Sequence, residues 1–345
     1  MADCCLFISM GEMHNAEVSA LDNSNVVEAA RNSKLFIIAR RAGRLANRLV
    51  LFAHFIAFAE EKGHRVFNFT FNSYANLFET TQRDVFCRYP ALVQKSWVDS
   101  VPGLAHAIRS SRIFYHAIRF ASEWQTRLPI LGQGTVILRE REKTENTPLH
   151  HPKVLDQIRD AHVVLVDGWR FCASEWVQRH APKIRSYFRP VAACRESSRQ
   201  AVDCLRQRSD VVIGVHIRQG DYRRWRGGKF FFTISQYARW MRELVEQFPG
   251  RQVSFLVCSD ESRHANEFPR LNVEFGPGAP VTDLYALAQC DYILGPPSTF
   301  SHWASFYGNK PLFHVTDNHV RPDLDRFAPS RLNFREIYLA LELPS

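Results

Sequence analysis

The sequence has 345 residues, enough for two domains of roughly 150 residues each, and its 46% hydrophobic and 23% charged residues exclude extended disorder. The net charge of +9 favours an anionic ligand, while lysine and arginine form no long basic run of the kind that binds nucleic acids. No segment reaches the roughly 20 apolar residues of a membrane span, and the start lacks the pattern of a secretory signal. The eight cysteines form no Cys-x-x-Cys pair. We therefore expect a cytoplasmic protein, with peripheral association at a membrane as an alternative.

The N-terminal half begins with a strand–helix–strand pattern. Residues 1–32 are polar and without a clear period, so we expect a loose N-terminal arm. Residues 34–40 (KLFIIAR) predict an apolar strand, and apolar residues then recur at helical spacing from Leu45 until Gly63, a residue type that often follows helix ends. Residues 65–71 (RVFNFTF) predict a second strand. This order predicts a parallel sheet with a right-handed crossover.

The remaining chain alternates between strand and helix patterns, except for residues 75–160, which carry no readable motif. Residues 163–168 predict a strand, and residues 173–188 predict a helix that ends before Pro190. Five apolar segments predict strands in the C-terminal half, together with a helix over residues 234–248: 211–217, 253–258, 272–275, 291–295 and 311–315.

Alternating strands and helices in both halves predict an α/β fold with two Rossmann-like lobes, whose parallel sheets face a cleft. We place the lobes at residues 33–205 and 206–345. Ligands in such sheets bind beyond the carboxyl ends of the strands, and three polar segments are expected there.

The first of these segments is HIRQGDY, after the strand over residues 211–217. His216 and Arg218 lie two residues apart, so their side chains point to one face. Gly220 permits a tight turn close to a ligand, and the guanidinium group of Arg218 suits a diphosphate. Asp221 can hold that arginine in place or accept a proton. Short patterns recur freely, so the alternative is a surface arginine beside a hydrogen-bonded core histidine.

The second segment spans residues 282–308. Thr282 or Asp283 is expected to cap a short helix, and Ser298 and Thr299 to open another after a strand that ends in Gly-Pro-Pro. The N-terminus of a helix offers free backbone N–H groups and the positive end of the helix dipole, which suits a phosphate group. The alternative is that Ser298 is only an N-cap.

The third segment, AGRLANRLVLF, follows the first strand. Gly43 and Asn47 lie at the carboxyl end of that strand, on the lip of any cleft between the lobes. The alternative here is a turn glycine and a helix cap. We expect the three segments to face one another.

Motifs of other ligand-binding classes are missing. The sequence has no P-loop, and residues 276–281 (GPGAPV) neither match G-x-G-x-x-G nor are expected to open a helix, which disfavours a Rossmann-type dehydrogenase. There is no H-E-x-x-H, and His150 and His151 are adjacent, unlike a helical metal-binding pair. The D-x-D at residues 323–325 does not follow an apolar strand. We therefore expect no metal site.

Taken together, these segments resemble the α-1,2-fucosyltransferase family, which uses GDP-fucose. GVHIRQGDY is similar to the family's His-x-Arg-Arg-Gly-Asp-Tyr motif, and GRLANRL to its Gly-x-Leu-Gly-Asn-Gln segment. Residues 166–176 (VDGWRFCASEW) are similar to its Gly-Tyr-Phe-Gln segment, and residues 283–308 to its Asp-Leu and Ser-Thr-Phe-Ser-Trp-Trp region. Order and spacing agree over roughly residues 35–315, although Gln219 stands where the family usually has a second arginine.

The resemblance implies a GT-B-like fold and an inverting transferase that needs neither a metal nor another cofactor. It assigns GDP-sugar binding to the C-terminal lobe and acceptor binding to the N-terminal lobe. The residues it implies for donor binding are His216, Arg218, Asp283, Ser298, Thr299 and Phe300, with Gly43 and Asn47 at the cleft, and those for catalysis are Arg218 and Asp221.

We therefore expect transfer of fucose from GDP-fucose to a hydroxyl group of an acceptor oligosaccharide, with α-1,2 linkage to galactose as the first choice. A related transferase that uses another GDP-sugar or forms another linkage is the nearest alternative. A basic nucleic-acid-binding protein is an alternative from another class, disfavoured because no helix carries a basic stripe.

Overall fold

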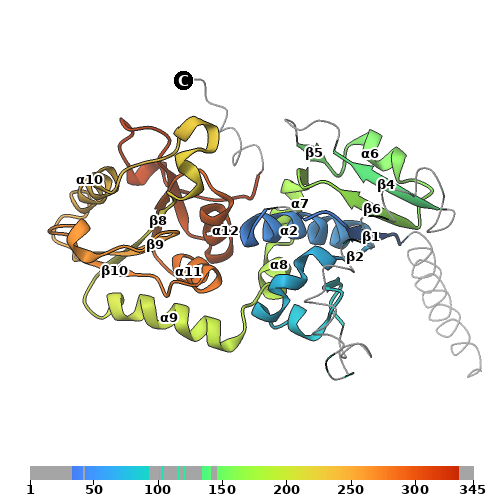
Figure 1. Cartoon of the computed structure of the whole chain (residues 1–345), viewed down its shortest axis with the longest axis horizontal. Helices are drawn as coiled ribbons and strands as arrows, with labels where there is room; N and C mark the ends of the chain where they lie inside the picture. Colours follow the sequence, from blue (N-terminus) through green and yellow to red (C-terminus); the bar gives the residue numbers. More distant parts are fainter. Residues whose placement is uncertain are drawn as a thin grey trace, which may run out of the picture.

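The computed structural model describes residues 33–41, 43–92, 101, 103, 116, 120, 134–140 and 146–333. They form two α/β lobes that lie side by side, each built on a largely parallel sheet (Figure 1). The predicted architecture of two α/β lobes with largely parallel sheets is confirmed. The predicted arm over residues 1–32 lies outside the described residues.

The N-terminal lobe contains a five-stranded sheet. In the order in which they lie, its strands are β3 (Arg88–Tyr89), β2 (Arg65–Phe67), β1 (Leu35–Ile38), β6 (Val163–Asp167) and β4 (Thr135–Arg139). All neighbours are parallel except β2 and β3. Since β1 has β2 on one side and β6 on the other, the strand order reverses between β1 and β6. Reversal points of this kind are where open α/β sheets bind ligands, at the carboxyl ends of the strands.

Helix α2 (Leu45–Lys62) connects β1 to β2 and is buried around most of its circumference. It contacts α7 (Ser174–Arg179), α8 (Ala181–Tyr187) and α12 (Thr299–Gly308), the last of which belongs to the other lobe. Because these neighbouring helices cover α2 on several sides, the apolar residues of α2 extend beyond a single stripe. Gly63 ends it in the left-handed conformation (φ 66°), as predicted.

Two predicted elements of this lobe have different boundaries. The strand predicted over residues 65–71 ends at Phe67, and a 3-10 helix, η1 (Phe69–Leu77), follows it. The strand ends here because the Asn68 side chain accepts a hydrogen bond from the Thr70 hydroxyl (2.7 Å), which favours a local turn. The helix predicted over residues 173–188 is divided into α7 and α8. Pro182 lies in the first turn of α8, where it has no amide hydrogen to continue the hydrogen bonding from α7.

The remaining small elements complete the N-terminal lobe. They are η2 (Thr81–Arg83), α6 (Pro152–Gln157) and a separate parallel pair formed by β5 (Thr147–Pro148) and β7 (Phe171–Cys172).

The C-terminal lobe contains a six-stranded sheet in the order β10 (Val273–Phe275), β9 (Val253–Ser259), β8 (Val211–Ile217), β11 (Tyr292–Gly295), β12 (Pro311–His314) and β13 (Ala328–Pro329). Only β13 is antiparallel to its neighbour. The strand order reverses between β8 and β11, which places a second ligand-binding position at their carboxyl ends. Every residue of β8 is buried, as expected for a central parallel strand.

The other elements of this lobe are helices α9 (Ala192–Arg206), α10 (Ile234–Val245), α11 (Pro280–Leu287) and α12, with short 3-10 turns η3 (Asp221–Arg223), η4 (Trp225–Gly228), η5 (Ala265–Glu267) and η6 (Leu324–Arg326). Helix α9, which the sequence analysis placed in the N-terminal lobe, packs on α11, β8 and β9 (Figure 1). The Ser198 hydroxyl in α9 donates to the Thr282 carbonyl of α11 at 2.8 Å.

The expected caps of α11 are wrong. Neither Thr282 nor Asp283 is the N-cap, because α11 begins at Pro280, whose missing amide hydrogen costs nothing at the first helical position. The segment GPGAPV therefore does open a helix, contrary to expectation. By contrast, Ser298 caps α12 as predicted, and its hydroxyl accepts from the Phe300 amide at 3.2 Å.

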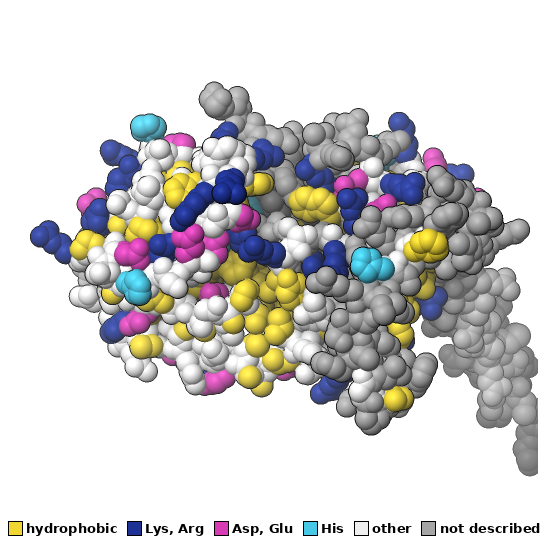
Figure 2. All heavy atoms as spheres, in the orientation of Figure 1, with side chains coloured by type: hydrophobic (Ala, Val, Ile, Leu, Met, Phe, Trp, Pro, Cys, Tyr) yellow, Lys and Arg dark blue, Asp and Glu magenta, His cyan; other side chains and the backbone are white. Residues whose placement is uncertain are grey.

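Two further features concern the surface charge and the length of the apolar helices. On the face shown in Figure 2, lysine and arginine side chains are interspersed with acidic ones over the C-terminal lobe and form no continuous stripe. Among the helices that the structure describes, none is both long enough and apolar enough to cross a membrane.

Candidate active site

A cavity of about 700 Å³ lies between the lobes, at the carboxyl ends of the strands where both sheets reverse their order. Its volume is in the range of small-molecule sites. Residues of both lobes line it, and they include every site residue that the sequence analysis named: Gly43, Asn47, His216, Arg218, Asp221, Asp283, Ser298, Thr299 and Phe300. The expectation that the three segments face one another is confirmed.

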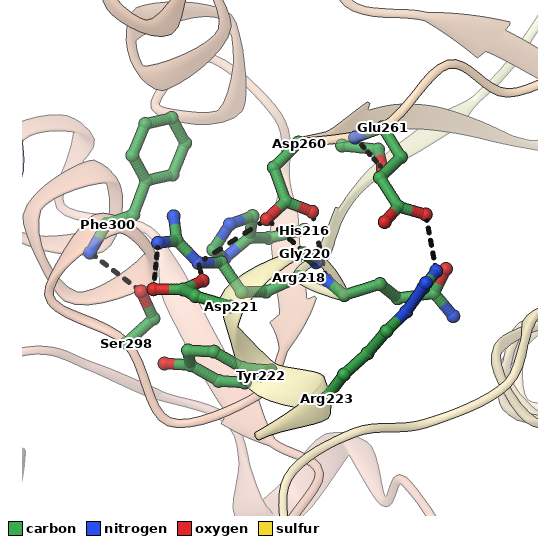
Figure 3. Close-up of polar contacts among 12 residues, drawn as sticks. His216, Arg218, Gly220, Asp221, Tyr222, Arg223, Asp260, Glu261, Ser298 and Phe300 are labelled. Atoms are coloured by element: carbon green, nitrogen blue, oxygen red, sulfur yellow. Dashed lines mark hydrogen bonds and ion pairs between the residues drawn. The ribbon is translucent and has the colours of Figure 1, made fainter. Parts of the chain in front are cut away.

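Arg218 lies in the turn after β8 and is held by two carboxylates (Figure 3). Its Nε and Nη2 atoms donate to the two oxygens of Asp221, both at 2.9 Å, and Nε also lies 3.6 Å from Asp260 Oδ2. The Arg218 side chain is only 17% exposed. Burial alone would raise the pKa of Asp221, but the hydrogen bonds from Arg218 outweigh burial and lower that pKa. The pair is therefore an ion pair at neutral pH, with a guanidinium group fixed at the cavity wall.

Asp260 also lines the cavity and was not predicted from the sequence. It follows β9, and its two oxygens accept the backbone N–H groups of Gln219 (2.9 Å) and Gly220 (3.2 Å), which shapes the turn that carries Arg218. A Cβ on Gly220 would lie 3.0 Å from Asp260 Oδ2. The signal was available, because an aspartate directly after a buried strand lies at the binding edge of the sheet.

His216 is buried beneath this turn as a neutral imidazole. Its Nδ1 atom is 2.8 Å from the Ser301 hydroxyl, and its ring lies 4.8 Å from the ring of Phe300, centre to centre. Burial, reinforced by the nearby charge of Arg218, lowers the pKa of His216 to about 3. His216 therefore joins β8 to α12 and offers a ligand an uncharged ring.

The N-terminus of α12 lies beside the arginine turn. The Tyr222 hydroxyl, in the same turn as Arg218, donates to the carbonyl of Pro297 at 2.7 Å and so ties the two segments together. The first turn of a helix has backbone N–H groups without intrahelical partners, and Ser298 satisfies one of them. A guanidinium group and a helix N-terminus thus converge on one part of the cavity, an arrangement that suits a diphosphate.

Asp283 lines another part of the cavity, beside the turn at residues 276–278. Its Oδ1 atom accepts from the Gly278 amide at 2.8 Å, and its other oxygen can accept from a ligand. Burial raises the pKa of Asp283 to about 6, although the Gly278 hydrogen bond opposes the shift. A Cβ on Gly276 would lie 2.6 Å from Asp283 Oδ1, so only glycine permits this close approach. The buried carboxylate suits a ligand that carries N–H donors.

The N-terminal lobe contributes the opposite wall of the cavity. Gly43 has φ +51°, and its carbonyl accepts from Arg48 Nε and Nη2, both at 3.2 Å. Asn47 is not a helix cap, since α2 begins at Leu45, and its side-chain oxygen instead accepts from the Thr299 hydroxyl of α12. This hydrogen bond joins the lobes at the cavity. The aromatic lining residues Tyr74, Trp169 and Trp225 were missed, because nothing in their spacing distinguishes lining rings from core rings.

The D-x-D segment has a structural role in the described chain, where the side chain of Asp323 accepts from the Asp325 amide at 3.1 Å and caps η6. Among the described residues, no group of three or more His, Cys, Asp or Glu side chains is placed to bind a metal ion.

Comparison with known proteins finds relatives among glycosyltransferases. A model of the family described as glycosyl transferase family 11 matches residues 177–323, which include the Arg218 turn and α12. Galactoside α-(1,2)-fucosyltransferase 1 of Saimiri sciureus is 25% identical over 175 residues, covering 44% of this chain and 45% of the relative. The same enzyme of Alouatta belzebul is 25% identical over 210 residues, covering 53% and 54%. The chain spans about half the length of these relatives. The predicted resemblance to α-1,2-fucosyltransferases is thus confirmed.

The chain is also similar to solved structures. POFUT1 in complex with GDP has 13% sequence identity and a TM-score of 0.47, with 81% of this chain and 95% of that chain covered. The fucosyltransferase NodZ from Bradyrhizobium has 17% identity and a TM-score of 0.47, with 86% and 96% covered.

Proposed function

We propose that the protein is a fucosyltransferase that moves fucose from GDP-fucose to a hydroxyl group of an acceptor glycan, with inversion at the sugar carbon and without a metal ion. The observation that carries the proposal is the convergence of Arg218, fixed by Asp221 and Asp260, with the N-terminus of α12. These groups provide the positive charge and N–H donors that a departing nucleoside diphosphate requires.

The mechanism follows from where charge develops. As the bond between the fucose carbon and the phosphate oxygen breaks, negative charge grows on GDP and positive charge on the sugar. Arg218 and the N–H groups of α12 would stabilise the departing diphosphate, and one such preorganised donor contributes about 3 kcal/mol, or roughly a hundredfold in rate. The acceptor hydroxyl would attack from the N-terminal lobe and lose its proton.

Asp221 would orient Arg218 rather than remove that proton. Both of its oxygens already accept hydrogen bonds from Arg218, and its lowered pKa makes it a weak base. In the transition state, breaking of the bond between fucose and GDP runs ahead of attack by the acceptor, so the proton of the acceptor hydroxyl can pass to solvent.

Guanine is the base that Asp283 suits best. Guanine presents an N1–H and an exocyclic amine on one edge, and a carboxylate accepts from both, whereas adenine and uracil present no such pair of donors. The names of the matched relatives support galactose as the acceptor and an α-1,2 linkage. We also propose a cytoplasmic location, supported by the absence of disulfide bonds among the cysteines that the structure describes.

Calorimetric titration with GDP, ADP and UDP tests the nucleotide, and a donor panel of GDP-fucose and GDP-mannose with galactoside acceptors tests the sugar. We expect binding selective for GDP and transfer from GDP-fucose. Turnover of GDP-mannose but not GDP-fucose would favour the alternative GDP-sugar transferase. Absence of GDP binding, together with salt-sensitive binding to mixed DNA, would favour the nucleic-acid alternative.

A further inference from the structure

Two aromatic side chains of the N-terminal lobe line the cavity at the point where the N-terminal sheet reverses its strand order. Trp169 follows β6, and Tyr74 lies in η1, which follows β2, the strand on the other side of β1. We propose that Tyr74 and Trp169 form an aromatic wall that binds a neutral hexopyranose ring of the acceptor. This inference rests on the proposed function, because it assigns the acceptor side of the same cavity.

The position of Tyr74 is set by Arg48. The guanidinium carbon of Arg48 lies 5.0 Å from the centre of the Tyr74 ring, within the range of a cation–π contact. Arg48 Nη1 also donates to the Thr70 carbonyl (2.7 Å) and to the Ser73 hydroxyl (2.9 Å), while its other nitrogens bind the Gly43 carbonyl. One arginine therefore connects α2, the Gly43 turn and η1, and fixes the ring before a ligand arrives.

The position of Trp169 is set by Glu140, the residue after β4. The carboxylate of Glu140 accepts the backbone N–H groups of Trp169 and of Arg170, the latter at 2.7 Å. The guanidinium carbon of Arg170 lies 5.4 Å from the Trp169 ring. Both rings are thus preorganised by charged neighbours, and ordering them costs a ligand little entropy.

The chemistry of this wall separates it from the donor side. The groups suited to a diphosphate and to guanine, Arg218, α12 and Asp283, all belong to the C-terminal lobe. Of the described N-terminal-lobe residues that line the cavity, Arg44 is the one with a charged side chain. Sugar rings combine apolar C–H faces with polar edges, and tyrosine and tryptophan combine an apolar body with one polar group. The wall therefore fits an uncharged sugar better than a nucleotide.

The test compares Trp169→Ala, Trp169→Phe, Tyr74→Ala and Tyr74→Phe with the unchanged protein. The matched control is Trp176→Phe, because Trp176 stacks on Phe58 at 5.6 Å and does not line the cavity. Calorimetry measures GDP binding, and titration of GDP-loaded protein with lactose, cellobiose and N,N′-diacetylchitobiose measures sugar binding. Initial rates over both substrates separate the KM of the acceptor from that of GDP-fucose.

We expect the alanine variants to bind GDP within about twofold of the unchanged protein and to raise the acceptor KM roughly tenfold or more, with smaller losses for the phenylalanine variants. An unchanged acceptor KM in both alanine variants would overturn the inference, and so would an increase in the KM of GDP-fucose alone. If the unchanged protein binds GDP but none of the sugars, the wall is refuted while the nucleotide assignment stands. If it does not bind GDP, the proposed function fails first.

Discussion

Arg218→Ala is the substitution that tests the proposed chemistry most directly. The Arg218 side chain is 17% exposed, and both of its closest partners are carboxylates at the wall of the same cavity. Its removal takes away one cation and also leaves Asp221 and Asp260 beside the place where the diphosphate would lie. The variant therefore converts a site that attracts anions into one that repels them.

The expected loss of activity in Arg218→Ala has two contributions. Loss of one preorganised donor to the departing group costs about 3 kcal/mol, or roughly a hundredfold in rate. A carboxylate left about 4 Å from a phosphate charge adds up to about 4 kcal/mol of repulsion at an effective dielectric constant near 20. We therefore expect kcat/KM to fall by at least about a hundredfold, with weaker GDP binding as well. Arg218→Lys should lie in between, because lysine keeps the charge but cannot bind both oxygens of Asp221.

The assay is GDP release from GDP-fucose with a galactoside acceptor, together with GDP calorimetry and thermal unfolding of each variant. Arg223→Ala is the matched control, since Arg223 lies in the same turn, pairs with Glu261 at 2.8 Å and does not line the cavity. It should retain near-normal activity. The double variant Arg218→Ala/Asp221→Asn should bind GDP better than Arg218→Ala alone. Near-normal transfer by a folded Arg218→Ala variant would refute the reasoning.

Three further predictions concern carboxylates and buried histidines. Asp221→Asn should lower kcat about tenfold and leave the acidic limb of the pH–rate profile in place, whereas loss of that limb would identify Asp221 as the base. GDP affinity should weaken as pH falls through about 6, where Asp283 takes up a proton, and Asp283→Asn should bind more weakly and without that pH dependence, as calorimetry at several pH values would show. Burial lowers the pKa of several histidines in the folded state, so below about pH 6.5 only the unfolded chain gains their protons. The free energy of unfolding should therefore fall with decreasing pH by up to about 1.4 kcal/mol per pH unit for each such histidine. A constant melting temperature between pH 7.5 and 5 would contradict this prediction. These histidines are His54, His64, His216, His302 and His314.

Much of the fold was predictable because the strands are short apolar runs separated by helices with regular spacing. Strand β8 and helix α12 have nearly the predicted boundaries, since burial on both faces and a serine N-cap are strong local signals. The errors occur where local and tertiary preferences compete. The break at His180 between α7 and α8 and the start of α11 at Pro280 both depend on where a proline falls in the helical turn.

The sequence by itself determined that His216, Arg218 and Ser298 lie at the cavity, because strand direction and turn residues place them at the carboxyl edge of a parallel sheet. Only the tertiary structure decided what each of them does. Asp221 binds Arg218 through both oxygens within one turn of the chain, but Asp260, which shapes that turn, comes from a segment about 40 residues further along the sequence. The wall formed by Tyr74 and Trp169 is likewise a product of folding, because a ring has the same local spacing whether it faces a core or a cavity.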